Sequence, residues 1–219
     1  MQDAQNDVDT WGLSQETLNR FLGFCEIQSR TKNHVLTRPG DCAGDLMYMI
    51  SGEVTVYAME EGERELTLGE FRAGDFIGEI GIFFPTGPRG VYIRAKTAVE
   101  YAEISATEFK RLMRGPLSKE AANLLFAIGA QLSRRLLETR RKASSLALMD
   151  VESRIRRTLW DIHAELPYKH DDGPAVRISR KDLASRVGCT REVSGRVIKR
   201  LSDQGWLVDQ GKVLVLKQP

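Results

Sequence analysis

The chain has 219 residues, of which 42% are hydrophobic and 28% are charged, and its formal net charge is +2 at pH 7. This length suits one or two domains with a buried core, and the composition is that of an ordinary soluble protein, which excludes a disordered or fibrous chain. No apolar run reaches the roughly 18 residues of a membrane span, and the polar, acidic N-terminus is unlike a secretion signal. We therefore expect a cytoplasmic protein that does not enter a membrane.

The charge is unevenly distributed along the chain. Residues 1–149 carry 18 Lys and Arg against 20 Asp and Glu, whereas residues 174–219 carry 10 against 4. A basic C-terminal segment is typical of polyanion binding, although a solvated charged face would have the same composition. The three cysteines and three histidines have no metal-ligand spacing, so we expect a reducing compartment and no metal site.

The first part of the chain predicts a short helix followed by many strands. Residues 1–12 are expected to form a disordered tail. Residues 13–25 predict a helix, with Ser14 as its N-cap and a helical apolar stripe. From about residue 34 to residue 104, short apolar or alternating runs are cut by glycine turns, which favours an antiparallel barrel or jelly roll.

A glycine-rich segment, residues 74–83, lies in this strand-rich region, and Arg89 follows Glu79 by ten residues. Backbone N–H groups around Gly78 and the start of a short helix could approach an anion. Arg89 could make a forked contact with a phosphate, and Glu79 could accept a hydrogen bond from a ribose 2′-OH. A plain jelly-roll corner would show the same glycine pattern, so both interpretations stay open.

Residues 117–145 predict one long amphipathic helix, because apolar residues recur every three or four positions and its only glycine is Gly129. Its length exceeds what packing on one small domain needs. We interpret its apolar face as a dimer seam, and the alternative is a helix folded back along its own domain. Residues 146–150 follow as a hinge, and Asp150 is a good N-cap for a helix to about residue 165.

The C-terminal part predicts a winged helix-turn-helix over residues 151–219. Ser179 caps a helix over residues 180–187, and Gly188 stands at the turn, where a positive φ is cheap for glycine. A second helix follows this turn. Residues 205–216 predict a closing hairpin, which would form the wing.

Three side chains on one side of this second helix suit the reading of bases. Arg191 and Arg196 are of the type that contacts guanine O6 and N7, and Glu192 can accept a hydrogen bond from cytosine N4. Neighbouring basic side chains are better placed for phosphates, which position a protein without specifying a sequence. The other residues that we assign to the DNA interface are Arg180, Lys181, Thr190 and Lys199.

In combination, these motifs resemble the CRP/FNR family of bacterial regulators from about residue 13 to the C-terminus. The segments that carry the resemblance, in family order and nearly at family spacing, are 74–83, 94–97, 102–105, 150–151 and 187–192. The resemblance implies an α+β architecture. It would comprise a cyclic-nucleotide-binding jelly roll over residues 13–116, a dimerisation helix over residues 117–145 and a winged helix-turn-helix.

The resemblance also implies function. The chain would be a homodimeric transcriptional regulator, an activator or a repressor but not an enzyme, that binds double-stranded DNA at TGTGA-like half-sites and contacts RNA polymerase. It would hold no tight cofactor and would respond to a cyclic nucleotide. In cAMP-binding relatives the counterparts of Gly78, Glu79 and Arg89 hold ribose and phosphate, and that of Thr139 reaches the adenine. The other residues that we place in the ligand site are Ile80, Gly90, Arg135 and Arg140.

Two departures from the family pattern bear on the effector. Gly90 replaces the serine that usually follows the phosphate-binding arginine, and this removes a hydroxyl donor. Arg140 replaces the serine or threonine that helps to hold adenine from the partner subunit. We expect cAMP first. The alternatives are cyclic di-GMP, to which a relative with a deviation at the same serine responds, and no effector at all.

Other positions leave further alternatives open. Glu26, Gln28 and Glu108 stand where polymerase-contacting members have basic or imidazole side chains, and Ser194 stands at a usually apolar position. A cupin-like enzyme barrel would need a His/Glu metal cluster, for which the strand-rich region offers only His34. A nucleotide sink or assembly protein with a degenerate DNA module is the remaining alternative.

Overall fold

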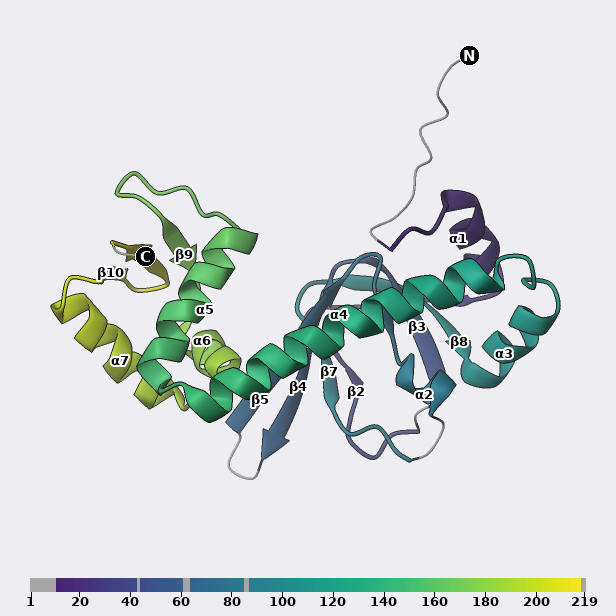
Figure 1. Ribbon diagram of the computed structural model, residues 1–219, viewed down its shortest axis with the longest axis horizontal. Coiled ribbons are helices and arrows are strands. Elements are labelled where there is room, and N and C mark those ends of the chain that lie inside the picture. The colour runs from purple at the N-terminus through teal and green to yellow at the C-terminus, as the bar shows by residue number, and fades with distance from the viewer. Residues whose placement is uncertain (1–10, 43, 61–63, 85–86, 218–219) are drawn as a thin grey trace, which may run out of the picture. The chain divides into compact units, whose positions relative to one another are not determined.

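The computed structural model describes residues 11–42, 44–60, 64–84 and 87–217 of the chain (Figure 1). Contacts within the chain divide it into two compact units. The first unit consists of Met1–Tyr57 and Gly69–Glu138, and the second of Ala58–Leu68 and Thr139–Pro219. Most of the expected N-terminal tail lies outside the described residues. The functional domain boundaries, including the hinge, stay predictions.

The strand-rich region is a sandwich of antiparallel strands, as the sequence predicts. Within the described residues, one four-stranded sheet has the order β1-β8-β3-β6 and the other has the order β2-β7-β4-β5. The strands are β1 (Glu26–Arg30), β2 (Val35–Thr37), β3 (Asp45–Ser51), β4 (Glu53–Glu60), β5 (Arg64–Arg72), β6 (Phe76–Ile77), β7 (Tyr92–Ala95) and β8 (Val99–Ser105). The short helix α2 (Ile80–Phe83) follows β6 directly.

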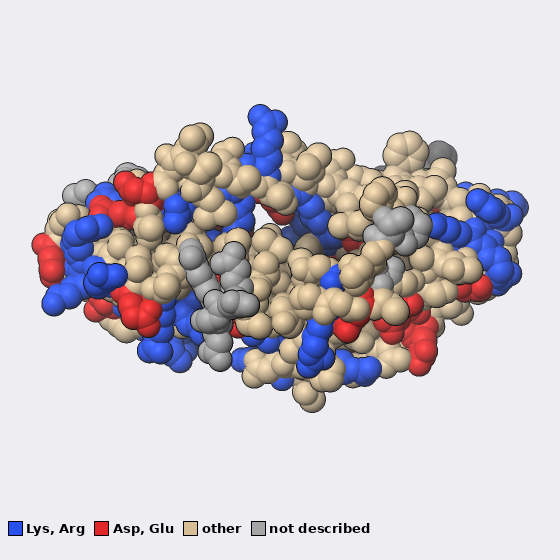
Figure 2. Space-filling model, turned by 90° about the horizontal axis from the view of Figure 1, so that it is seen from below, with Lys and Arg blue, Asp and Glu red and all other residues tan. Residues whose placement is uncertain are grey.

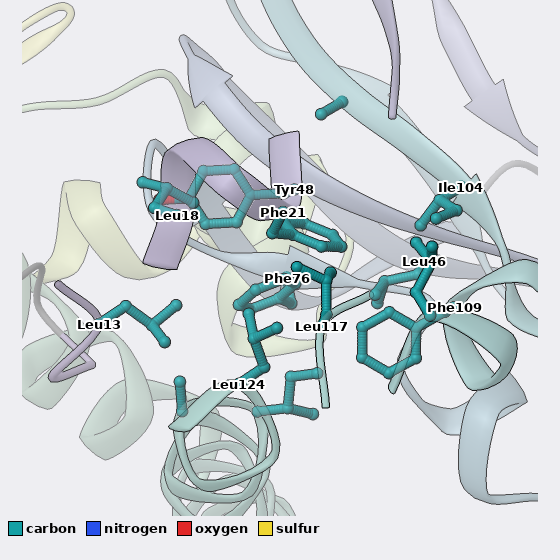
Figure 3. Close-up of a cluster of buried hydrophobic side chains, with 14 of the residues drawn as sticks. Leu13, Leu18, Phe21, Leu46, Tyr48, Phe76, Ile104, Phe109, Leu117 and Leu124 are labelled. Carbon is teal, nitrogen blue, oxygen red and sulfur yellow. The ribbon is translucent and has the colours of Figure 1, made fainter. Parts of the chain in front are cut away.

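Helices close one side of this sandwich and complete its core. They are α1 (Gln15–Leu22), α3 (Ala106–Arg114) and the N-terminal half of α4 (Ala121–Leu148). The ring of Phe21 contacts those of Phe76 and Phe109, with centroids 5.9 and 6.0 Å apart (Figure 3). Each ring is almost fully buried, so this aromatic cluster joins α1, β6 and α3.

The long helix differs from its predicted bounds at both ends. Residues 115–120 form turns instead of helix, because Gly115 ends α3 and the Leu117 N–H donates back to the Leu112 carbonyl at 2.9 Å. At the other end, α4 continues to Leu148 and so includes the first three residues of the predicted hinge. Leucine and alanine there favour helix, and Asp150 then caps the next one.

The second unit contains the predicted helix-turn-helix and hairpin. Its further helices are α5 (Val151–Glu165), α6 (Arg180–Val187) and α7 (Arg191–Asp203). Among the described residues, β10 (Leu207–Gln210) and β11 (Val213–Leu216) form the hairpin, and β9 (Ala175–Arg177) adds a third strand beside β11. Asp150, Ser179 and Thr190 cap the three helices as their side chains accept backbone N–H groups.

The segment Ala58–Leu68 packs with α6 in the same unit. Thr67 Oγ1 and Ser185 Oγ share a hydrogen bond of 2.8 Å, and both side chains are buried. Leu66 approaches the turn after α6, where its Cδ1 lies 3.3 Å from the point that a Cβ on Gly188 would occupy. The first helix of the pair is therefore fixed by contacts distant in sequence.

Ser194 is an exception in the core of the second unit. It is fully buried on α7, and its hydroxyl has no hydrogen-bond partner among the described residues. Burial of an unpaired hydroxyl costs free energy, because the group loses its water without gaining an acceptor.

We predict that Ser194→Ala raises the free energy of unfolding by about 1 kcal/mol beyond the gain from alanine's helix propensity. The propensity gain is measured with Ser202→Ala, at a half-buried serine on the same helix. Urea denaturation of the three proteins, followed by tryptophan fluorescence, gives the comparison. An equal gain in both variants, or a loss at residue 194, would show that the hydroxyl has a partner.

Candidate functional site

The glycine-rich segment forms a tight corner between β6 and α2. Gly78 has a φ of 90°, which favours glycine. A Cβ on it would lie 2.2 Å from the carbonyl oxygen of Asp45 and 3.0 Å from Nη1 of Arg89. The glycine is therefore required on two grounds, and its backbone lies directly against the Arg89 guanidinium.

Arg89 is held in place from both its backbone and its side chain. Its Nη2 donates to the Asp45 carbonyl at 2.9 Å, and its backbone N–H donates to the Asp41 carbonyl at 2.8 Å. The guanidinium keeps further N–H groups that can donate to an anion. A Cβ at the neighbouring Gly90 would meet no atom within 4 Å, so the position of the missing serine is open.

Glu79 is buried beside this corner and is neutralised by Arg135 of α4. Its side chain is only 6% exposed, and Arg135 Nη1 lies 2.5 Å from Glu79 Oε1. Arg135 Nη2 also donates to the Phe76 carbonyl, and the guanidinium lies 3.8 Å from the centroid of the Phe71 ring. Burial lowers the pKa of Arg135, and the nearby Glu79 carboxylate acts against that shift.

Two further polar side chains of α4 hold the same segment, and neither is among the ligand-site residues that the sequence predicts. Gln131 Oε1 accepts from the Phe76 N–H at 2.9 Å while its Nε2 donates to the Phe76 carbonyl at 2.7 Å. Arg134 lies 3.7 Å from Asp75 and stacks over the Trp11 ring. The sequence does contain a sign of the Gln131 contacts, because this glutamine lies within the apolar stripe of the helix and a buried amide must have hydrogen-bond partners.

The structure gathers only part of the predicted ligand site. Gly78, Glu79, Arg89 and Arg135 lie together in the first unit, next to Gly90. Ile80 follows Glu79 but its side chain is 65% exposed. Two predicted members, Thr139 and Arg140, belong to the second unit and are exposed. Their contribution to the site stays a prediction.

The second candidate site begins at the turn between α6 and α7. Gly188 has a left-handed φ of 72°, and the Cys189 N–H donates to the Ala184 carbonyl at 3.0 Å. A Cβ at Gly188 would lie 2.9 Å from Leu146 Cδ2. The Thr190 hydroxyl then accepts from the Val193 N–H at 3.3 Å and starts α7.

The three predicted base-reading side chains all lie on the surface. Arg191, Glu192 and Arg196 are exposed on α7, while Val197 and Leu201 of the same helix are buried. Hydrogen bonds from the backbone N–H of Glu192 and from Thr190 lower the pKa of the Glu192 carboxyl. It is therefore ionised near neutral pH and can only accept hydrogen bonds.

The side chains assigned to phosphates have different surroundings. Lys199 and Lys181 are exposed, and Lys181 lies 3.6 Å from Glu65. Arg180 is half-buried and is paired with the Asp209 carboxylate of the wing. Figure 2 shows Lys and Arg interspersed with Asp and Glu on the face that it displays, so charge alone does not mark an interface there.

No group of three or more His, Cys, Asp or Glu side chains within the described residues is placed to hold a metal ion. The three cysteines are free thiols, and burial raises the pKa of Cys25 to about 12. Among the helices of the described chain, none has the length and apolar character that crossing a membrane requires.

Comparison with known proteins matches both sites to established domains. The family model of the cyclic nucleotide-binding domain matches residues 27–115, and that of the Crp-like helix-turn-helix domain matches residues 153–219. The CRP-like protein Clp of Xanthomonas oryzae pv. oryzae (strain PXO99A) is 44% identical over 214 residues. The alignment covers 97% of this chain and 93% of that protein.

Solved structures extend the match to three dimensions. The structure of the c-di-GMP responsive global regulator CLP of Xanthomonas campestris has a TM-score of 0.87 and 45% identity. It covers 93% of this chain and 99% of its own. A CRP/FNR family regulator from Thermus thermophilus has a TM-score of 0.69 at 23% identity and covers 88% of this chain and 94% of its own, so it supports the fold alone.

The buried ion pair of the first site yields a stability prediction. Arg135→Ala should lower the free energy of unfolding by about 3 kcal/mol, because it leaves the Glu79 carboxylate buried without its partner. The double variant Arg135→Ala with Glu79→Gln should recover part of this loss, since the charge is then removed. Chemical denaturation of the wild type and both variants measures the change. A double variant no more stable than Arg135→Ala alone would contradict the pairing.

Proposed function

The chain belongs to the CRP/FNR family of transcriptional regulators, and we propose that it is a homodimer whose affinity for DNA is set by a cyclic nucleotide in the first unit. Membership rests on both domain models and on the 44% identity over nearly the whole chain. The protein is thus a CRP-like DNA-binding regulator and not a cupin-like enzyme. The proposal concerns its effector, its base contacts and its dimer seam.

The exposed apolar face of α4 supports the dimer. Phe126, Leu136 and Leu137 are 77%, 70% and 53% exposed on this helix, although neighbouring Leu124 and Ile128 are fully buried. A row of large apolar side chains on a long helix is costly to leave in water and marks an association surface. Members of the family are dimers, and we place the seam of this one along α4.

The grouping of Glu79, Arg89 and Arg135 around the Gly78 corner carries the effector proposal. Arg89 offers N–H donors for a phosphate, and Glu79 is an acceptor for a ribose hydroxyl. Arg135 adds a second guanidinium whose charge is balanced by Glu79 in the free protein. A cyclic nucleotide has both the anion and the hydroxyl that this donor and acceptor set requires.

Among cyclic nucleotides we favour cyclic di-GMP, and cAMP is the second candidate. The Xanthomonas campestris relative with 45% identity is c-di-GMP responsive. Two positions also depart from the pattern of cAMP-binding relatives and so disfavour cAMP. Gly90 lacks the hydroxyl of the usual serine, and Arg140 has a charge where those relatives have serine or threonine. The corner with Gly78, Glu79 and Arg89 favours cAMP, because it keeps the ribose and phosphate positions of cAMP-binding relatives.

Two α7 helices related by dimer symmetry would enter successive major grooves about 34 Å apart, at palindromic TGTGA-like half-sites. Arg191, Glu192 and Arg196 would contact base edges there. We also propose contact with RNA polymerase through a surface unlike the basic one of other members. On this surface Glu108 is neutralised by Arg111, with contacts of 2.6 and 2.8 Å.

Calorimetry with cAMP, cGMP and cyclic di-GMP tests the effector. We expect cyclic di-GMP to bind, and Arg89→Ala to weaken binding at least tenfold because a charged hydrogen bond to phosphate is lost. Arg38→Ala, at an exposed arginine of the same unit, is the control and should leave affinity unchanged. Binding of none of the three ligands, or equal affinity of wild type and Arg89→Ala, would contradict the site.

Arg191→Ala tests the base contacts. The variant should lose about 1–3 kcal/mol of discrimination at one base pair of each half-site, because one guanine contact is removed. Lys199→Ala should weaken binding to all sequences alike, as expected for a phosphate contact. Titration of each protein against a set of mutated half-sites makes the comparison. Full discrimination by the Arg191→Ala protein would show that the assignment is wrong.

A further inference from the structure

The tip of the wing holds a carboxylate between two donors. Asp209 stands in β10, two residues before Gly211 in the turn to β11. Its Oδ1 atom accepts a hydrogen bond from Arg180 Nη2 at 2.5 Å and another from the Gly211 backbone N–H at 3.0 Å. An arginine of α6 and the backbone of the wing thus converge on one oxygen atom.

These two donors are of the kinds that bind DNA phosphates. Arginine side chains and backbone N–H groups supply many of the hydrogen bonds to phosphate oxygens in protein–DNA complexes, and arginine can bind a phosphate with two parallel N–H groups. Here only one of the two terminal nitrogens of Arg180, Nη2, donates a hydrogen bond to the carboxylate. Arg180 Nη1 is buried and has no hydrogen-bond partner among the described residues. The position therefore offers more hydrogen-bond donors than the single Asp209 oxygen accepts.

The carboxylate lies at the surface of an otherwise basic segment. The side chain of Asp209 is 31% exposed and that of Arg180 is 20% exposed, so a ligand can approach the pair, although Arg180 Nη1 itself is buried. Residues 174–219 contain 10 basic and only 4 acidic side chains, and the three other acids have different surroundings. Asp182 pairs with the cap Ser179, while Glu192 and Asp203 lie on α7.

We propose that Asp209 occupies a phosphate-binding position made by Arg180 and the Gly211 N–H, and thereby limits the affinity of the free protein for DNA. A phosphate that enters this position must displace the carboxylate, or approach it against charge repulsion. Pairing with the Asp209 carboxylate also explains how the charge of Arg180 can be half-buried in the absence of DNA. This inference rests on the proposed DNA interface, in which Arg180 faces the phosphate backbone.

The test is the affinity for a palindromic site as a function of salt, measured by fluorescence anisotropy on the full-length protein. Asp209→Asn keeps the shape and the acceptor for Gly211 but removes the charge. It should bind DNA several-fold more tightly at low salt. The slope of log K against log salt should become steeper by about 1.8, the value for one additional phosphate contact in each of the two protomers. Asp203→Asn, an equal change of charge at an exposed acid on α7, should produce neither effect.

Arg180→Ala in both backgrounds completes the cycle. The substitution should cost little affinity in the wild type, where the guanidinium is already neutralised, and at least several-fold more in Asp209→Asn. Weaker binding by Asp209→Asn would overturn the proposal, because Asp209 would then position Arg180 for phosphate. Unchanged affinity and slope, or an equal gain in Asp203→Asn, would also overturn it. A wild-type protein without sequence preference would instead contradict the proposed interface.

Discussion

A left-handed turn at Gly188 sets the arrangement of the two helices that we propose as the DNA interface. The turn lets α6 and α7 share a core through Leu183 and Val197 while the start of α7 stays at the surface. A side chain at the turn would be strained, because the backbone has a φ of 72°, and its Cβ would lie 2.9 Å from Leu146 Cδ2, which would have to move. The shared core of α6, α7 and the hairpin positions the groups that we assign to DNA. These are the exposed arginines and glutamate of α7, the wing and the paired Arg180. The base contacts that we propose for them therefore depend on a left-handed backbone conformation that favours glycine.

One helix connects the ligand site to the surface that we assign to the dimer. On one side of α4, Gln131, Arg134 and Arg135 hold the segment from Asp75 to Glu79 through hydrogen bonds and ion pairs. On the same stretch of helix, Leu136 and Leu137 are exposed. A ligand that competes for Glu79 or Arg135 therefore acts on an ion pair whose arginine belongs to the helix in which we propose the dimer seam. An effector can shift the protein between conformations only by its differential affinity for them, and this ion pair is a place where such a difference can arise.

Local chemistry explains which parts of the structure could be predicted. The caps Ser14, Asp150 and Ser179, the Gly188 turn and the alternating strands each depend on neighbours in sequence, and all lie where the sequence predicts. The sequence pattern places the start of α4 too early, because Leu117 in the turns after Gly115 lies four residues before Ala121 and so continues the helical spacing. The partners of Glu79 and Asp209 could not be predicted, since Arg135 and Arg180 lie 56 and 29 residues away and meet them only through tertiary packing. The family resemblance indicates Arg135 as a ligand-site residue but not as the partner of Glu79. The partners of Gln131 and Arg134, at Phe76 and Asp75, are likewise distant in sequence and could not be predicted.

The most direct test of the account is methylation interference on a bound palindromic site. A methyl group on guanine N7 blocks the acceptor that an arginine of α7 would use. Paired α7 helices should give interference at guanines in both half-sites, in two clusters about 10 base pairs apart, with the same pattern on the two strands. Interference confined to one half-site, or an affinity that is indifferent to every methylated guanine, would contradict the claim that paired α7 helices contact base edges.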